Sequence, residues 1–271
     1  MDKLDYGTLL SFEPLPLQGG CSIISPTLKE ISKIGFHTYQ SYLSLMLLDL
    51  EHYFQILTKD SEYFNQYAKE EKEILLKINS DYHLLSEAQK KNITLLDVLS
   101  FDKPMMKHIG EALSFFLNSS LDYSYEERVF HIRKDNQEFI SLPFYFHPSI
   151  ADLILQRNGI TQKKQKESLK FKNKLAEKLY QRSMQAEHNF NKTSNIDKNM
   201  ELPNIISAVA AYHPSINIIN IWDMTVFQLY DQFQRLQNNN VYKIQSISVA
   251  TWGDEKNKFD ATQWFKNLNN P

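Results

Sequence analysis

The chain has 271 residues, a formal net charge of −2, only seven glycines and one cysteine. This length is sufficient for a substantial buried core in one or two domains. The scarcity of glycine argues against a glycine-rich phosphate-binding loop and against an all-β fold with many tight turns. The small net charge gives no reason to expect nucleic acid or an anionic membrane surface as a partner.

The single cysteine, Cys21, cannot form a disulfide within the chain, which favours a reducing compartment. The N-terminal sequence lacks the charged segment and long apolar run of a signal peptide. The longest apolar stretch, residues 43–50, is too short to cross a bilayer. We therefore expect a soluble cytoplasmic protein with no membrane partner.

The first two dozen residues are expected to be extended. Pro14 and Pro16 exclude a helix over residues 9–17. Gly19 and Gly20 then turn the chain into a second short strand, so the sequence predicts a hairpin here.

Helical spacing dominates the next hundred residues. Ser25 and Pro26 suit the N-cap and the first helical position, and Gly35 is a favourable end for that helix. Further helices are predicted where apolar residues recur at intervals of three and four, over residues 36–58, 63–78 and 105–117.

One clear strand pattern interrupts these helices. Side chains alternate over residues 128–142, and Asp135-Asn136 supply turn chemistry at the centre. We therefore expect an inserted β-hairpin.

The pattern over 241–251 does not distinguish strand from helix. After the hairpin, helices are predicted over residues 148–158, 202–212, 220–236 and 261–268.

These elements predict a mainly α fold of the α+β class. It is a multi-helix, bundle-like domain with an inserted β-hairpin and a short N-terminal extended segment. We assign residues 1–189 to this helical domain, with the hairpin at 128–142, and the polar, Asn-rich segment 190–200 to a linker. Residues 201–271 form a C-terminal helical region that either stands alone or packs on the first domain as one unit.

The motifs that identify common enzymes are missing from the sequence. It contains no phosphate-binding glycine loop, nucleophile elbow, His-Glu-x-x-His helix or cysteine cluster. The eight histidines are scattered singly, so no metal site is predicted. His147 and His213 each precede a proline, which explains them as boundary residues rather than catalytic ones. We predict a protein that is not an enzyme and needs no metal or cofactor.

A run of lysines over residues 162–178 is the one local concentration of charge. It is interpreted first as a solvated helix face, next as a surface for an acidic protein partner, and last as a nucleic-acid surface. Nucleic-acid surfaces usually add arginine and stacking aromatics, and no arginine lies between Arg157 and Arg182. The candidate anion-binding or acidic-partner residues are Lys163, Lys164, Lys166, Lys170 and Lys174.

The best-defined packing surface is the segment Asn220–Leu236. Asn220 is expected to cap its helix, and Asp223 stands where a capping-box acid would reach back. Its large apolar residues recur at helical spacing and share one stripe, which is either core or a partner surface. Spacing alone does not distinguish the two. The candidate partner-binding residues are Trp222, Phe227, Tyr230, Phe233 and Arg235.

Three segments carry a family resemblance: ISPTLKEISKIGFHTYQSYLSLM (24–46), LPFYFHPSIADLILQRNGI (142–160) and INIINIWDMTVFQLYDQFQRL (216–236). They resemble proteins encoded beside tail and baseplate genes in tailed phages and prophages of low-GC Gram-positive bacteria. The resemblance implies a non-enzymatic role in virion assembly, similar to a tail or baseplate assembly chaperone that acts in the host cytoplasm.

Three alternatives stay open. The resemblance also allows a structural component retained in the virion. Beside it stand a phage regulator that binds a host protein and an enzyme of an unrecognised class. The implied partner is a phage tail or baseplate protein, and a second copy of the chain is a further candidate. Neither nucleic acid nor a membrane is expected as a partner.

Overall fold

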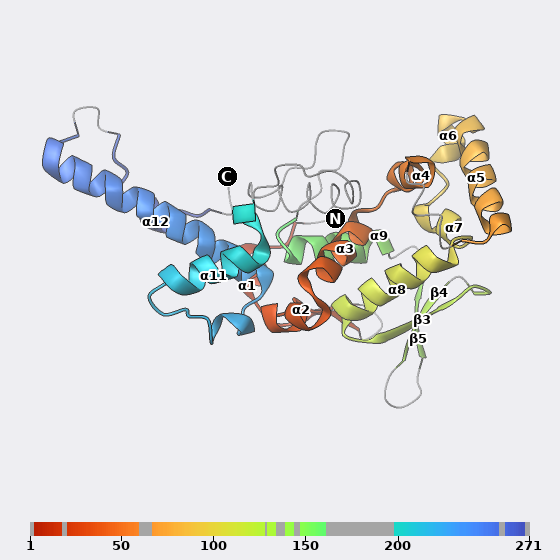
Figure 1. Ribbon diagram of the computed structural model, residues 1–271, viewed down its shortest axis with the longest axis horizontal. Coiled ribbons are helices and arrows are strands. Elements are labelled where there is room, and N and C mark those ends of the chain that lie inside the picture. Colours follow the sequence, from red (N-terminus) through yellow and green to blue (C-terminus); the bar gives the residue numbers. More distant parts are fainter. Residues whose placement is uncertain are drawn as a thin grey trace.

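The computed structural model describes residues 3–17, 21–59, 67–127, 129–133, 139–143, 147–160, 198–254 and 258–268. Within these residues the fold is mainly α with an inserted β-hairpin, as the sequence predicts. The molecule is elongated (Figure 1). Helices α4, α5 and α6 lie at one end, and the last turns of α12 project from the other.

The N-terminal segment is partly helical rather than wholly extended. Its elements are α1 (Tyr6–Leu10), β1 (Leu15–Pro16) and β2 (Ser22–Ile23). Helix α1 begins because the Asp5 carboxylate accepts the Thr8 N–H at 3.0 Å, a cap that the sequence analysis missed. The hairpin prediction is confirmed, since β1 and β2 pair antiparallel.

The next helix starts two residues later than predicted. Helix α2 (Leu28–Ile34) is capped by Thr27, whose hydroxyl accepts the Glu30 N–H while the Glu30 carboxylate accepts the Thr27 N–H. Ser25 and Pro26 are instead buried in the extended chain before it. The predicted end at Gly35 is confirmed by its φ of +91°.

The long helix predicted over 36–58 is wrong in one respect, because it is broken at Leu48 and Asp49. Leu48 is extended, and the Asp49 carboxylate accepts the His52 N–H at 2.7 Å, which starts a new helix. The helices up to the sheet are α3 (Phe36–Leu47), α4 (Leu50–Lys59), α5 (Lys69–Leu84), α6 (Glu87–Lys90), α7 (Leu95–Leu99) and α8 (Lys103–Leu117).

The predicted hairpin is part of a three-stranded antiparallel sheet in the order β3-β4-β5. Its strands are β3 (Ser120–Ser124), β4 (Val129–Arg133) and β5 (Phe139–Pro143). Strand β3 was not predicted, because SLDYS lacks a run of β-branched residues. The sheet packs against α8, where the Phe130 ring lies beside Gly110.

After the sheet come α9 (His147–Arg157), η3 (Lys198–Met200), α11 (Leu202–Tyr212), η4 (Ile221–Asp223), α12 (Val226–Trp252) and η5 (Gln263–Phe265). The predicted helices at 148–158 and 202–212 are confirmed. The helix predicted over 261–268 is wrong, since only the short turn η5 forms there.

Both predicted ends of the 220–236 helix are wrong. Asn220 and Asp223 belong to the turn around η4, and α12 begins after Thr225, which forms a capping box with Gln228. The helix then continues through Gln237–Asn240 to Trp252. Neither glycine nor proline interrupts it before Gly253, whose φ of +80° ends it.

One cluster of buried apolar side chains joins elements from before residue 160 and after residue 200. Thr27 and Thr225 form an isolated antiparallel bridge, and the Leu28 N–H donates to the Met224 carbonyl at 2.8 Å. The starts of α2 and α12 therefore lie side by side. The domain boundary at 189 and most of the linker fall outside the described residues, and the division stays a prediction.

Candidate functional site

The aromatic residues predicted from the 220–236 segment lie in different environments. Phe227 and Tyr230 are buried, at 5% and 4% exposure. Trp222 and Phe233 are half-buried and pack against the core, with Trp222 in η4 rather than on α12. The inner part of the stripe therefore belongs to the core of this chain, and partner binding by these residues stays a prediction.

Arg235, the remaining residue of that set, is part of a polar cluster that holds α1 against α12. Its Nε donates to Asp231 at 3.0 Å, its Nη2 donates to the Tyr6 hydroxyl at 2.9 Å, and Tyr6 donates to Asp231 at 2.7 Å. The bond to Tyr6, together with the Asp231 carboxylate, raises the pKa of Arg235. Burial and the bond to Asp231 raise the pKa of Tyr6. The cluster therefore favours the charged guanidinium and the neutral phenol.

Removing this guanidinium should lower stability. Arg235→Ala is expected to reduce the free energy of unfolding by about 1–3 kcal/mol, because the carboxylate of Asp231, only 4% exposed, loses a charged donor. Urea denaturation measures the change. Lys243→Ala, on an exposed part of the same helix, is the matched control and should change stability by less than about 0.5 kcal/mol. Equal effects of the two variants would contradict the structural role of Arg235.

The C-terminal part of α12 and the chain that follows it form a projection that we call the arm (Figure 1). It consists of Gln237–Trp252 and the return segment 258–268. The Asp254 carboxylate accepts the N–H groups of Lys258 and Phe259, which directs the chain back along the helix. The rings of Tyr242 and Phe259 then stack at 5.5 Å.

The base of the arm is fixed by a reciprocal pair of amides. Asn238 donates its side-chain N–H to the Gln263 carbonyl, and the Gln263 side chain donates to Asn238 Oδ1 at 3.2 Å. The return segment therefore has a defined position on one side of α12.

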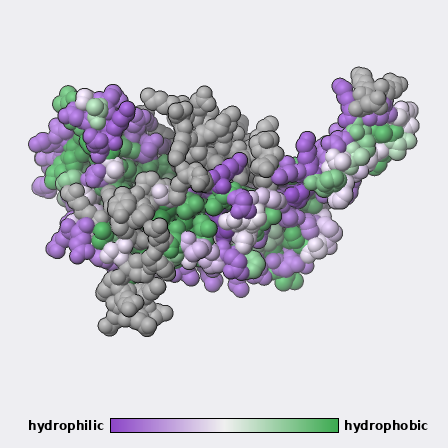
Figure 2. All heavy atoms as spheres, turned by 180° about the vertical axis from the view of Figure 1, so that it is seen from behind, coloured by the Kyte–Doolittle hydropathy of each residue, from purple (hydrophilic) through white to green (hydrophobic). Residues whose placement is uncertain are grey.

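The arm exposes more large apolar side chains than any other described element of comparable length. Figure 2 shows such side chains along the arm, which projects at the upper right. Monomeric soluble proteins seldom leave large contiguous apolar patches in water, so such a surface indicates a contact. The exposed fractions are 44% for Val241, 69% for Ile244, 67% for Ile247, 80% for Trp252, 53% for Trp264 and 56% for Phe265.

These residues form two separate surfaces. At 3.6 residues per turn, Ile244 and Ile247 point away from the side of α12 that Asn238 and Tyr242 present to the return segment. We call Val241, Ile244 and Ile247 the helix stripe, because Trp252 lies about 140° around the helix from Ile247 and faces another direction. The second surface is the aromatic pair Trp264 and Phe265 of η5, whose ring centroids are 4.9 Å apart at 74°.

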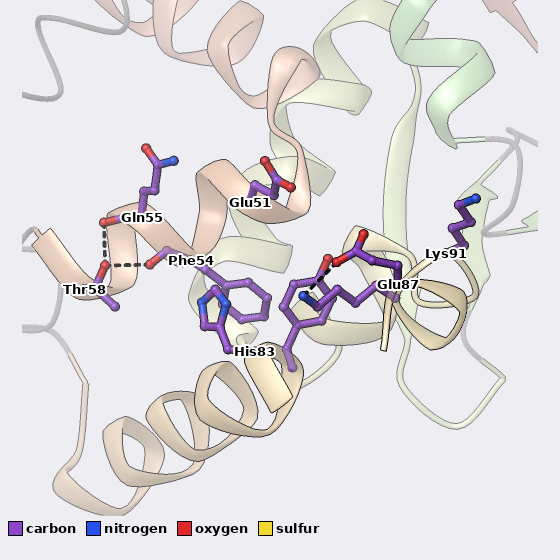
Figure 3. Close-up of a pocket in the computed structure, with 9 residues that line it drawn as sticks. Glu51, Phe54, Gln55, Thr58, His83, Glu87 and Lys91 are labelled. Carbon is purple, nitrogen blue, oxygen red and sulfur yellow. Dashed lines mark hydrogen bonds and ion pairs between the residues drawn. The ribbon is translucent and has the colours of Figure 1, made fainter. Parts of the chain in front are cut away.

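A pocket of about 420 Å³ lies at the opposite end of the molecule, between α4, α5 and α6 (Figure 3). Phe54 lines it, with the Tyr82 ring 4.9 Å away and the His83 ring 6.0 Å away. Lys90 lies over Tyr82 at 5.6 Å and pairs with Glu87 at 3.2 Å. The ammonium group at this pocket is therefore already paired within the chain.

The polar groups of this pocket are not aimed at a common point. The Thr58 hydroxyl donates to the Phe54 carbonyl at 2.9 Å, within its own helix. Glu51 on α4 and Lys91, which follows α6, lie on different parts of the lining (Figure 3). A nucleophile would need a base within hydrogen-bond reach, and none is paired here among the described residues. We assign no reaction to this pocket.

The five candidate lysines, Lys163 to Lys174, lie outside the described residues, so the anion-binding prediction stays a prediction. In the part of the chain that the structure describes, no group of three or more His, Cys, Asp or Glu side chains is placed to hold a metal ion. None of the described helices combines the length and the apolar character needed to cross a membrane.

The arm lies in the part of the chain that matches a family model. Residues 190–269 match the YomV second domain family. The match indicates a phage-associated protein, in agreement with the coarser part of the resemblance seen in the sequence. Comparisons of the chain with curated proteins and with solved structures give no match.

The sequence analysis missed the helix stripe, although its signal is present. Val241, Ile244 and Ile247 recur every third residue, which is close to helical spacing. The pattern was not assigned to a helix because the preceding Gln237–Asn240 looked like a helix end.

Proposed function

We propose that this protein binds a virion component during phage assembly, as a tail or baseplate assembly chaperone that is not an enzyme and acts in the host cytoplasm. The observation that carries the proposal is the exposure of Trp264 and Phe265 on the arm. The phage association from the matched segment, which includes this pair, supports the biological setting.

Two neighbouring exposed aromatics suit a binding role for a physical reason. Tryptophan contributes a large apolar area with few rotatable bonds, and it is enriched among residues that dominate binding energy. The reciprocal amide bonds between Asn238 and Gln263 fix the backbone beside the pair before any partner arrives. Such pre-organisation reduces the ordering cost of association.

The test is co-purification from phage-producing cells. The tagged wild-type chain should retain a protein that mass spectrometry also identifies in purified particles, and Trp264→Ala/Phe265→Ala should reduce its recovery at least about tenfold, a loss of 1.4 kcal/mol or more. The matched control is Phe12→Ala, which removes an aromatic side chain that is 68% exposed elsewhere in the chain. Its recovery of the virion protein should equal that of the wild type.

The same experiment separates the proposal from its alternatives. A chaperone is present in the lysate and missing from the finished particle, so recovery of the chain in purified particles would instead make it a structural component. A host protein as the dominant bound species would make it a regulator. Equal binding by the double variant and the wild type would exclude the aromatic pair as the site.

A further inference from the structure

We propose that His213 is a pH-sensitive latch for the loop between α11 and η4. The neutral imidazole holds the start of this loop, and a second ring proton releases it. The loop consists of residues 213–220 and lies beside α11 at the lower left of Figure 1. The inference goes beyond the proposed function and does not rest on it, because it follows from the hydrogen bonds of one side chain.

The latch consists of two hydrogen bonds from the backbone to one ring nitrogen. The Ser215 N–H donates to His213 Nδ1 at 3.2 Å, and the Ile216 N–H donates to the same atom at 3.0 Å. A backbone N–H can only donate, so Nδ1 supplies its lone pair and the ring proton lies on Nε2. A doubly protonated imidazole carries a proton on both nitrogens and has no acceptor. The loop conformation is therefore compatible only with the neutral ring.

The same loop contains a second turn of this kind, built with a side chain that does not titrate. The Asn217 Oδ1 accepts the N–H groups of Ile219 at 2.9 Å and Asn220 at 3.2 Å. Asparagine commonly makes such bonds to the backbone that follows it. Histidine is the side chain that changes charge between about pH 5 and 8. Of the two turns, only the one that begins at His213 therefore depends on pH.

The charged side chains around the loop leave the latch to the two N–H donors. Helix α11 packs on α12, and η4 packs on α2, while α11 itself carries no charged residue. Within the described part of the chain, the imidazole bonds only to Ser215 and Ile216 and forms no ion pair. The charged residues that the neighbouring elements carry toward this region are Lys29, Glu30 and Lys33 of α2, Asp223 of η4, and Arg235 and Lys243 of α12.

Release of the latch changes how the second turn is attached to α11. Ile216 is half-buried and packs against the core, whereas Ile218 and Ile219 are 54% and 83% exposed. In acid the Asn217 bonds keep the second turn formed. Its remaining side-chain link to the start of the loop is the bond from Asn220 Nδ2 to the Ser215 carbonyl, at 3.1 Å. Acid therefore loosens the attachment of an intact turn, and the two exposed isoleucines lose their fixed position.

Amide hydrogen exchange of the full chain, followed by NMR from about pH 8 to about pH 5, tests the latch. Each exchange rate is divided by the rate of the unfolded chain at the same pH. The corrected rates of Ser215 and Ile216 should rise about three- to tenfold in acid, because each N–H loses its acceptor. The corrected rate of Ile219 should stay constant, since its acceptor is the amide of Asn217.

Two substitutions separate the acceptor from the proton. His213→Asn places Oδ1 on Cγ, where histidine has Nδ1, so the corrected rates of Ser215 and Ile216 should stay low at every pH. His213→Ala has no acceptor, and both rates should be high at every pH. The matched control is His37→Asn on α3, which removes an exposed imidazole elsewhere and should show the same pH dependence as the wild type.

The inference is overturned if the corrected rates of Ser215 and Ile216 do not change while the His213 ring titrates. It is also overturned if His213→Asn keeps the pH dependence of the wild type, because the proton would then act at another group. An equal acid response of Ile219 would mean that the whole loop opens without the latch. Recovery of a virion component does not enter any of these measurements, so failure of the latch and failure of the proposed function are distinguishable.

Discussion

Asp102→Ala is expected to lower the free energy of unfolding by about 3–5 kcal/mol, one of the two largest effects that we expect from a single substitution in this protein. The Asp102 side chain is fully buried. Its carboxylate accepts hydrogen bonds from the Tyr53 hydroxyl at 2.6 Å, the Tyr67 hydroxyl at 2.7 Å and the Met105 N–H at 2.9 Å. One side chain thus connects α4, the start of α8 and the segment before α5.

The cost of this substitution has two sources. Alanine removes the N-cap of α8, which is worth about 1 kcal/mol. It also leaves two buried phenol hydroxyls without this acceptor, at about 1–3 kcal/mol each before any relaxation. Burial and the Asp102 charge both raise the pKa of Tyr53, so in the native state the phenol remains the donor at neutral pH.

Guanidinium denaturation of Asp102→Ala, with Asp81→Ala as the control, measures this effect. Asp81 is an exposed carboxylate on α5, and its removal should change stability by less than about 0.5 kcal/mol. Tyr53→Phe should be costly in the wild type and nearly neutral in the Asp102→Ala background, because its acceptor is already gone. Additive costs in this double-mutant cycle would show that the two groups do not depend on each other.

Local sequence signals were sufficient to predict an element where a residue type restricts or permits a particular backbone conformation. The helix end at Gly35 was predicted correctly, since this glycine adopts a positive φ that other residues seldom take. The hairpin at 128–142 was predicted because turn residues stand between two alternating segments.

Two of the wrongly predicted helix starts have the same cause. The sequence offers two plausible caps in each case, Ser25 or Thr27 for α2 and Asn220 or Thr225 for α12. The structure uses the two threonines, which pair with each other across the molecule. A contact between residues 198 positions apart therefore decided both starts, and neither window of sequence contains that information.

The length of α12 could not be predicted from its composition for a related reason. Asparagine in a helix costs at most about 0.7 kcal/mol relative to alanine, which tertiary contacts easily offset. Asn238 bonds to Gln263 and Asn240 to Tyr212, so two of the residues that looked like a loop are held in place by other segments. The burial of the apolar residues of α12 could not be predicted either. They recur at helical spacing both before these asparagines, where residues such as Tyr230 are buried, and after them, where residues such as Ile247 are exposed.

Phe227→Ala and Ile247→Ala, twenty positions apart on the same helix, should differ sharply in their effect on stability. Phe227 is 5% exposed, its ring lies 6.3 Å from the Tyr6 ring, and it closely approaches Gly159. Its truncation should cost about 3–5 kcal/mol, since it leaves a cavity between α1, α9 and α12. Ile247 is 67% exposed on the arm, and its truncation should cost less than about 0.5 kcal/mol.

This comparison decides whether the apolar surface of α12 has two functions along its length. Urea denaturation of both variants beside the wild type measures the difference. A small effect of Phe227→Ala, together with loss of the virion component, would mean that the buried ring is released to contact a partner. The large effect expected from its burial would instead assign the start of the helix to the core, leaving the arm beyond Gln237 free for association.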